Sequence, residues 1–266
     1  MCTLVVLRRP GHPWPLLLGA NRDEMEDRPW RPPARHWPDR PEVTAGMDLL
    51  AGGSWLGIND HGMVAAVTNR HGSLGPAPGR RSRGELVLEA LDHAGADEAA
   101  HALKQLDPAA YRPFNLLIAD PVACYWLRNR DRRIQLVTVG EGLHMLTAGD
   151  LDDPDDPRIG RYLPRFRSAK PPDPEAGDWR AWEALFGARE YLNDDQGPDR
   201  KSPGDPAGDA AATGAMCWRL DNGFGTRSGS LIALPRHPGP DAPPVWRFAA
   251  GPPDRTGYRP VTLSAG

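Results

Sequence analysis

The residues whose types and spacing are best suited to catalysis lie at the start of the chain and in a cluster further along. Cys2 follows the initiator methionine, and the run Asn21-Arg22-Asp23 follows an apolar segment. A cysteine is small enough for methionine aminopeptidase to remove Met1 and expose it. The freed α-amino group, whose reference pKa is about 7.7–8.0, can take the thiol proton at neutral pH. This arrangement predicts a nucleophile that carries its own base.

Two short strands are needed to bring the polar cluster to the N-terminus. The apolar residues 3–7 and 16–20 predict strands, and the Pro- and Gly-containing stretch between them predicts a hairpin loop. A turn centred in that loop places Cys2 opposite Asn21. The sequence therefore predicts that a thiol, an amine, a guanidinium and a carboxylate converge.

Each member of this cluster has a chemical and a structural interpretation. Arg22 would favour the thiolate by its charge, and Asp23 would hold or orient the α-amino group. The alternative is a structural ion-pair network formed by Arg22, Asp23 and Glu24 at a strand end. Cys2 taken alone is most often incidental.

A second hairpin presents an amide at a strand end. Residues 54–58 and 63–68 predict two strands, and folding them about their turn leaves Asn69 opposite Gly52. Such an amide, close to Gly52 and Gly53 where a substrate can approach the backbone, suits an oxyanion hole. The alternative is that Asn69 caps a turn.

Arginine residues suggest binding sites for an acidic group. Arg80, Arg81 and Arg83 surround a predicted helix start at Ser82, where an anion would be favoured. Arg227 has the same interpretation. For both places a solvated basic turn is an equally good explanation.

Outside these clusters, the pattern predicts a largely antiparallel protein. We expect one domain spanning residues 1–266, with a mobile loop at 193–215. Helices are predicted from residue 82, at about 97–106 and at 178–192. Further strands are predicted at 114–120, 124–128, 134–139, 143–147, 216–220, 228–234 and 245–250, the first four forming a meander.

Composition narrows the partners. The 266 residues carry a net charge of -3, which argues against nucleic acid or an anionic membrane surface as a partner. No apolar stretch reaches the length of a membrane span, and the three cysteines form no disulfide framework or zinc motif. We expect a cytoplasmic protein with a small-molecule ligand and no metal.

Several blocks of sequence together resemble the NRDE family, also called the transport and Golgi organisation protein 2 family. The blocks are "MCT", "GANRDE", "AGGSWLGINDHGMVAAVTN", "SRGELV" and "FGTR". The pattern is more remotely similar to the choloylglycine hydrolase and penicillin V acylase branch of N-terminal nucleophile hydrolases. This resemblance implies an α+β fold, a four-layer αββα sandwich of two antiparallel sheets.

Carried over position by position, the resemblance implies Cys2 as nucleophile, Arg22 and Asp23 as its supports, and Asn69 as oxyanion donor. The chain departs from the hydrolases in two places. They place Arg before Asn in the first cluster, and they carry a second Asn near the position where this chain has Ala148.

Two functions of different class remain open. The first is a cysteine amidohydrolase or acyltransferase that acts on a linear C–N amide through an acyl-Cys2 intermediate. The second is a non-catalytic carrier that binds a hydrophobic acid in the same cleft; the family resemblance suggests haem or acyl-CoA and lipid as cargo. No cofactor is expected in either case. The candidate substrate-binding residues are Asn21, Gly52, Gly53, Arg83 and Arg227.

Overall fold

The computed structural model describes residues 2–130, 132–189, 214–239 and 242–263. Apart from its last two residues, the predicted mobile loop at 193–215 lies outside this range.

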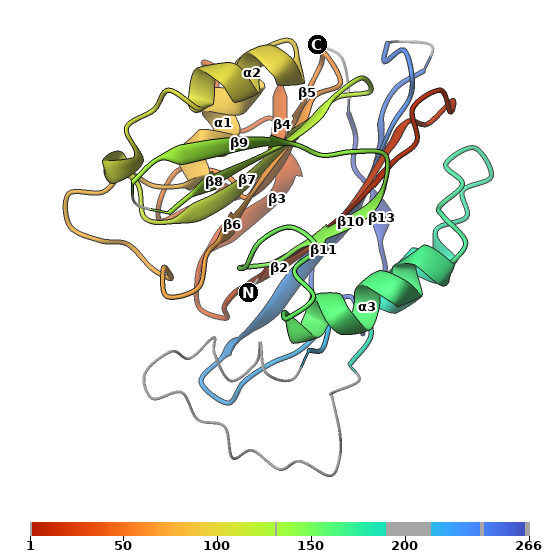
Figure 1. Cartoon of the computed structure of the whole chain (residues 1–266). Coiled ribbons are helices and arrows are strands. Elements are labelled where there is room, and N and C mark those ends of the chain that lie inside the picture. The colour runs from red at the N-terminus through yellow and green to blue at the C-terminus, as the bar shows by residue number, and fades with distance from the viewer. Residues whose placement is uncertain (1, 131, 190–213, 240–241, 264–266) are drawn as a thin grey trace.

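Two antiparallel sheets stack face to face, and helices cover the outer face of each sheet (Figure 1). The α+β sandwich expected from the resemblance is confirmed. Sheet A has the strand order β10 (Gly142–Leu146), β1 (Thr3–Arg8), β2 (Leu16–Met25), β11 (Phe224–Leu234), β12 (Val245–Ala249) and β13 (Arg259–Pro260) among the described residues. Sheet B has the order β3 (Trp30–Ala34), β4 (Val43–Asp48), β5 (Leu56–Asn59), β6 (Val64–Asn69), β7 (Phe114–Ala119), β8 (Cys124–Asn129) and β9 (Ile134–Thr138). The helices are α1 (Gly84–Leu91), α2 (Ala96–Leu103), the 3-10 turn η1 (Pro108–Ala110), α3 (Pro157–Ser168) and α4 (Arg180–Phe186).

Three apolar clusters hold the four layers together. Leu91 of α1 packs in the cluster between the helices and sheet B, and Leu18 and Leu117 lie in the cluster between the sheets. Leu17 and Trp182 belong to the cluster between sheet A and the helices α3 and α4. Both faces of β2 are therefore buried, which explains its continuous apolar run where an alternating pattern is usual for antiparallel strands.

The predicted four-stranded meander is wrong in its last strand. β7, β8 and β9 pair in sequence, but β10 crosses to sheet A and pairs with β1, where Leu4 faces Leu146. The same tight turn and apolar run are compatible with pairing of β10 with β9 and with pairing of β10 with β1. The local pattern therefore does not reveal which strand is the neighbour.

Other elements differ from the expectation in length or kind. The proline-rich stretch after Arg28 contains the edge strand β3, and β4 follows it; neither strand was predicted. Residues 216–220 form no named strand and contribute only an isolated bridge between Arg219 and Gly225. The helix predicted at 178–192 is the shorter α4 within the described residues. α3 was not predicted, since Pro164 lies inside it.

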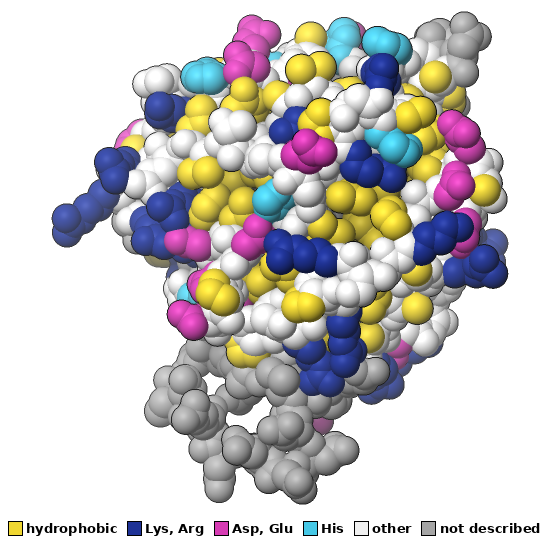
Figure 2. Space-filling model, turned by 45° about the vertical axis from the view of Figure 1, so that its right-hand side comes forward, with side chains coloured by type: hydrophobic (Ala, Val, Ile, Leu, Met, Phe, Trp, Pro, Cys, Tyr) yellow, Lys and Arg dark blue, Asp and Glu magenta, His cyan; other side chains and the backbone are white. Residues whose placement is uncertain are grey.

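Charges on the surface are mixed. On the face shown in Figure 2, Lys and Arg side chains are interspersed with acidic, histidine and hydrophobic side chains. Among the described residues, no helix is long and apolar enough to cross a membrane.

Candidate active site around Cys2

The first hairpin delivers the polar cluster to Cys2, in a register one residue away from the predicted one. Thr3 pairs with Asn21, so Cys2 lies beside Arg22 and Asp23. The Asp23 backbone N–H donates to Cys2 Sγ at 3.4 Å, and the thiol faces the Asp23 carbonyl oxygen at 3.7 Å. The irregular loop between the strands, in which His12 Nδ1 accepts from the Trp14 N–H, accounts for the one-residue shift.

The pKa of the Cys2 thiol is raised above its ordinary value. Burial is the main cause and the charge of Asp23 adds to it, whereas Arg22 and the hydrogen bond from the Asp23 backbone lower the pKa. The thiol therefore needs a base to react at neutral pH, and an α-amino group on the same residue would supply one.

Arg22 lies between the two sheets on the same side as the thiol. Its side chain is 4% exposed and its guanidinium stacks on the Trp55 ring, with Cζ 4.3 Å from the ring centroid. Nη2 lies 3.7 Å from Asp48 and 3.9 Å from Glu24, and Nη1 has no hydrogen-bond partner. One donor of a buried guanidinium is thus unused beside the thiol.

Asp23 points to the opposite face of sheet A because successive residues of a strand alternate in direction. Its carboxylate is fully buried and accepts from the Thr226 hydroxyl at 2.8 Å and the Trp218 indole at 3.0 Å. Arg158 of α3 lies 3.5 Å from it and donates to the Thr3 hydroxyl at 2.7 Å. Sequence reasoning missed Arg158, Trp218 and Thr226 as partners, although Thr226 lies in the quoted "FGTR" block.

Asn21 shares the face of Asp23 and points away from the thiol. Its amide nitrogen donates to the carbonyls of Phe186 at 2.9 Å and Met216 at 2.8 Å. This side chain therefore fixes β2 to the end of α4 and to the segment before β11.

The second hairpin is also shifted by one residue, since Leu56 pairs with Ala66 where the predicted turn would pair it with Ala65. Asn69 is the last residue of β6, pairs with Phe114 of β7 and is partly exposed. No hydrogen bond joins the side chains of these two described residues, Asn69 and Cys2.

The two candidate glycines differ in their surroundings. Gly52 has a φ of +70° and open space where a Cβ would lie. Gly53 packs against the backbone of Gly84 at the start of α1, where a Cβ would come within 2.5 Å. Gly52 thus faces space that a ligand can enter, whereas Gly53 permits a close backbone contact.

Arg83 lies in electrostatic reach of the thiol but bonds to a neighbouring loop. Its Nη1 donates to the Ser73 carbonyl at 2.6 Å and the Pro113 carbonyl at 3.2 Å. Burial, assisted by Arg112, lowers the pKa of Arg83 to about 10, and Cys2 is among the groups that oppose this shift. The helix predicted from Ser82 begins at Gly84, and the Ser82 hydroxyl accepts from the Gly84 N–H at 3.2 Å.

Arg227 holds the turn before β11. Its Nε donates to the Glu24 carbonyl at 3.0 Å, and Nη1 lies 3.8 Å from Glu26. Residue 227 falls in a register irregularity between Thr226 and Ser228. The bulge turns Thr226 toward Asp23 and leaves Ser228 facing the space between the sheets.

A small cavity adjoins the thiol. Cys2, Arg22, Trp55, Ser228 and Ser230 contribute to its lining, and its volume is about 10 Å³. Such a volume is room for about one water molecule. The cavity therefore admits a small group, such as a carbonyl oxygen, next to Sγ.

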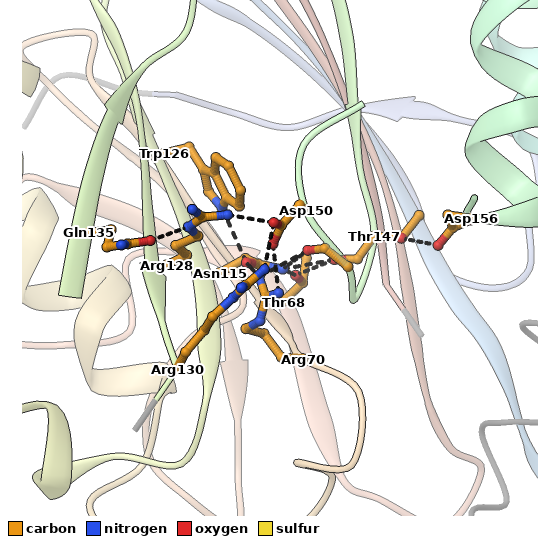
Figure 3. A network of polar contacts seen from close by, with 11 residues as sticks. Thr68, Arg70, Asn115, Trp126, Arg128, Arg130, Gln135, Thr147, Asp150 and Asp156 are labelled. Carbon is orange, nitrogen blue, oxygen red and sulfur yellow. Dashed lines mark hydrogen bonds and ion pairs between the residues drawn. The ribbon is translucent and has the colours of Figure 1, made fainter. Parts of the chain in front are cut away.

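A polar network joins sheet B to the loop that contains Ala148 (Figure 3). Arg70, Arg128 and Arg130 converge on Asp150, with an Arg70–Asp150 distance of 2.7 Å. Asn115 donates to the carbonyls of Thr147 at 3.2 Å and Gly149 at 3.0 Å, and the Thr68 hydroxyl donates to Thr147 at 2.8 Å.

The same loop continues toward the thiol. The Thr147 hydroxyl donates to Asp156, which caps the N-terminus of α3 and so orients Arg158 against Asp23. Ala148 itself is 1% exposed and packs in an apolar cluster with Trp218. Ala148 thus packs against the indole that donates to Asp23.

No cluster of metal-ligating side chains is found in the part of the chain that the structure describes.

Comparison with protein families gives one match that covers most of the chain. The profile of the family described as Transport and Golgi organisation 2 matches residues 1–237. The Transport and Golgi organization protein 2 homolog of Bos taurus is 37% identical over 151 residues, which cover 52% of this chain and 52% of that protein. The Homo sapiens homolog is 37% identical over 123 residues, covering 42% of this chain and 43% of the homolog. The matched region spans about half the length of these relatives or less.

Solved structures share the fold at low sequence identity. The Caenorhabditis elegans ortholog of N-acylethanolamine-hydrolyzing acid amidase has a TM-score of 0.50 at 13% identity, covering 91% of this chain and 95% of that one. A variant of the conjugated bile acid hydrolase from Clostridium perfringens has a TM-score of 0.50 at 12% identity, covering 100% and 99%. This chain therefore shares its two-sheet fold with an acid amidase and a bile acid hydrolase.

Proposed function

The chain belongs to the Transport and Golgi organisation 2 family, and from its fold and site we propose that it is an N-terminal nucleophile enzyme. The proposed activity is that of a cysteine amidohydrolase or acyltransferase acting on a linear C–N amide. The observation that carries this proposal is the Cys2 thiol in contact with the Asp23 backbone beside the buried Arg22 guanidinium. An N-acylethanolamine, the substrate class in the name of the worm enzyme, is such an amide.

In the proposed reaction, the α-amino group of Cys2, exposed by removal of Met1, accepts the thiol proton. Sγ attacks the amide carbonyl carbon and forms a tetrahedral oxyanion, for which Asn69 and a backbone N–H are the proposed donors. The C–N bond then breaks as the ammonium group gives its proton to the leaving amine. An acyl-Cys2 thioester remains, and water deprotonated by the same amine releases the acid; an acceptor amine in place of water gives acyl transfer.

The surroundings of each residue support a division of roles. Arg22 lowers the thiol pKa against the effect of burial and offers its free Nη1 to the cavity. Asp23 is proposed to orient the α-amino group. Asn21 is proposed to position β2, because its amide nitrogen already serves two carbonyls.

Among the candidate substrate-binding residues, Gly52 and Arg83 have the surroundings that fit this role best. Gly52 has open space beside it, and the half-buried Arg83 lies within electrostatic reach of the thiol. Gly53 and Arg227 are proposed to act indirectly. Gly53 packs closely on the backbone of Gly84, and Arg227 donates to the backbone carbonyl of Glu24.

Two measurements test the enzyme proposal. Intact mass should show a chain without Met1, and a series of chromogenic N-acyl nitroanilides should be hydrolysed by the wild type. Cys2→Ala should abolish hydrolysis and the acyl adduct seen by mass, whereas Cys124→Ala, at a fully buried cysteine in β8, should leave both. Retention of Met1, or hydrolysis that survives Cys2→Ala, would contradict the proposal.

The carrier alternative demands more space than the enzyme. A carrier must enclose much of haem or acyl-CoA, whereas an amidase needs only the scissile carbonyl to reach Sγ. The cavity of about 10 Å³ therefore favours the enzyme. Saturable binding of haem or acyl-CoA that survives Cys2→Ala, without any hydrolysis, would support the carrier instead.

We also propose a cytoplasmic location, because Cys2, Cys124 and Cys217 are all free thiols. Cell fractionation measures this directly.

A further inference from the structure

A second, larger hollow lies where both sheets end. It is lined by the edge strand β3 of sheet B and by the β12–β13 edge of sheet A, and its volume is about 520 Å³. This volume falls in the range of small-molecule sites, about 300–1,000 Å³. We call this hollow the edge groove.

The edge groove combines an apolar floor with positive charge. Val261, which packs against the core between the sheets, lines it together with Pro33 and with Phe248, whose ring packs against Trp30. Arg35 and Arg259 are its charged lining residues, and none of the acidic side chains that the structure describes lines it.

The two arginines differ in how far their charge is compensated. Arg35 pairs with Asp60 at 2.7 Å. Arg259 is exposed and forms no ion pair with any residue that the structure describes. Within the described residues, the groove therefore presents one guanidinium that has no acidic partner at the rim of an apolar surface, and an anion is its charge complement.

Aromatic residues separate the edge groove from the cavity at Cys2. Phe248 packs edge-on against Trp30 with ring centroids 5.9 Å apart, and Trp30 packs against Trp55 at 5.8 Å. Trp55 lines the Cys2 cavity, and the two linings have no residue in common. The groove is thus a separate site, one aromatic wall away from the thiol.

We propose that the edge groove binds a free fatty acid, with the alkyl chain along Phe248 and Val261 and the carboxylate at Arg259. The planar guanidinium matches a carboxylate in bidentate geometry, and the apolar floor removes the chain from water. This binding does not depend on Cys2 or on the proposed hydrolysis.

Calorimetric titration of the full chain with dodecanoate, below its micellar concentration, tests the proposal. We expect saturable binding of one dodecanoate, at least tenfold weaker binding of butyrate, and no binding of dodecyltrimethylammonium. Ala250→Trp, at an exposed lining position, should fill the groove and weaken binding at least tenfold. Ala34→Trp fills the groove from the β3 side and serves if Ala250→Trp does not fold.

Charge variants separate the site from general detergent-like binding. Arg259→Gln should weaken dodecanoate binding about two- to fivefold, the effect of an exposed ion pair. Arg133→Gln, just before β9 at the opposite edge of sheet B, should leave it unchanged. Cys2→Ala should also bind normally, so a failed hydrolysis assay and a failed groove are distinguishable. No saturable binding, equal binding of the cationic amphiphile, or equal effects of Arg259→Gln and Arg133→Gln would overturn the proposal.

Discussion

Arg22 and Asp23 are chain neighbours that serve opposite faces of one strand. Arg22 faces the space between the sheets, where it stacks on Trp55, whereas Asp23 faces α3 and is fully buried. A buried carboxylate needs compensating partners. Arg158 supplies a positive charge at 3.5 Å. The stability of the site therefore depends on a residue far along the chain from the nucleophile.

Replacing Arg158 should show this dependence. Arg158→Met keeps the side-chain bulk but leaves Asp23 without this charge partner, so the free energy of unfolding should fall by about 3 kcal/mol in urea denaturation. Arg165→Met, at an exposed position of the same helix where the guanidinium lies over the Tyr162 ring, is the control and should change it by no more than about 1 kcal/mol. An equal loss of unfolding free energy in both variants would show that the Asp23–Arg158 pair contributes no more to stability than an exposed arginine.

At the scale of elements, the site depends on β2, whose two faces are both covered by other elements. Gly19 of β2 lies against the Phe186 ring, which is fully buried and touches Phe166 and Trp182. A Cβ at residue 19 would come within 2.2 Å of that ring. The absence of a side chain at Gly19 lets α4 approach sheet A closely.

Gly19→Ala should therefore destabilise the protein by overpacking. We expect the free energy of unfolding to fall by about 1–3 kcal/mol, because the enclosed Phe186 ring has little room to move. Gly140→Ala places the same methyl group in open space and should be close to neutral. Thermal and urea denaturation of the two variants measure the difference, and a neutral Gly19→Ala would mean that α4 shifts without cost.

The elements also show how far sequence reasoning reaches. The hairpins 3–20 and 54–68 were recognisable because short apolar runs flank obvious turns, and their registers were wrong by one residue because loop irregularity is not encoded in hydrophobicity. The prediction that Cys2 lies close to Arg22 and Asp23 holds in spite of that one-residue shift. Arg158, Trp218 and the pairing of β10 with β1 depend on long-range packing, which no local pattern reveals.

At the scale of the whole molecule, Asp150 connects the two sheets. Burial would raise the pKa of this carboxyl, but Arg70, Arg130 and Arg128 outweigh that effect and hold the pKa below its ordinary value. Because the folded pKa is depressed, the ionised carboxylate stabilises the fold above about pH 3.9, and this contribution is lost as the pH falls through the folded pKa.

Asp150→Asn should remove this contribution and leave three arginines facing one another. We expect a loss of about 1 kcal/mol in the free energy of unfolding at pH 7, and convergence with the wild type as the pH falls below the depressed pKa of Asp150. Asp39→Asn, at an exposed carboxylate paired with one arginine, is the control and should have a smaller effect. A difference from the wild type that persists unchanged into acid would contradict the electrostatic explanation.

The crossing of β10 has a consequence for the order in which the protein is assembled during synthesis. Sheet B uses one continuous stretch, from β3 to β9, and can pair as that stretch leaves the ribosome. Sheet A collects β1 and β2 from the first residues, β10 from the middle and β11 to β13 from the end. The nascent hairpin that bears Cys2 must therefore wait for most of the chain before its neighbours arrive. Its thiol therefore stays accessible to chaperones, aminopeptidase and oxidants for longer than the parts of the site that are synthesised later.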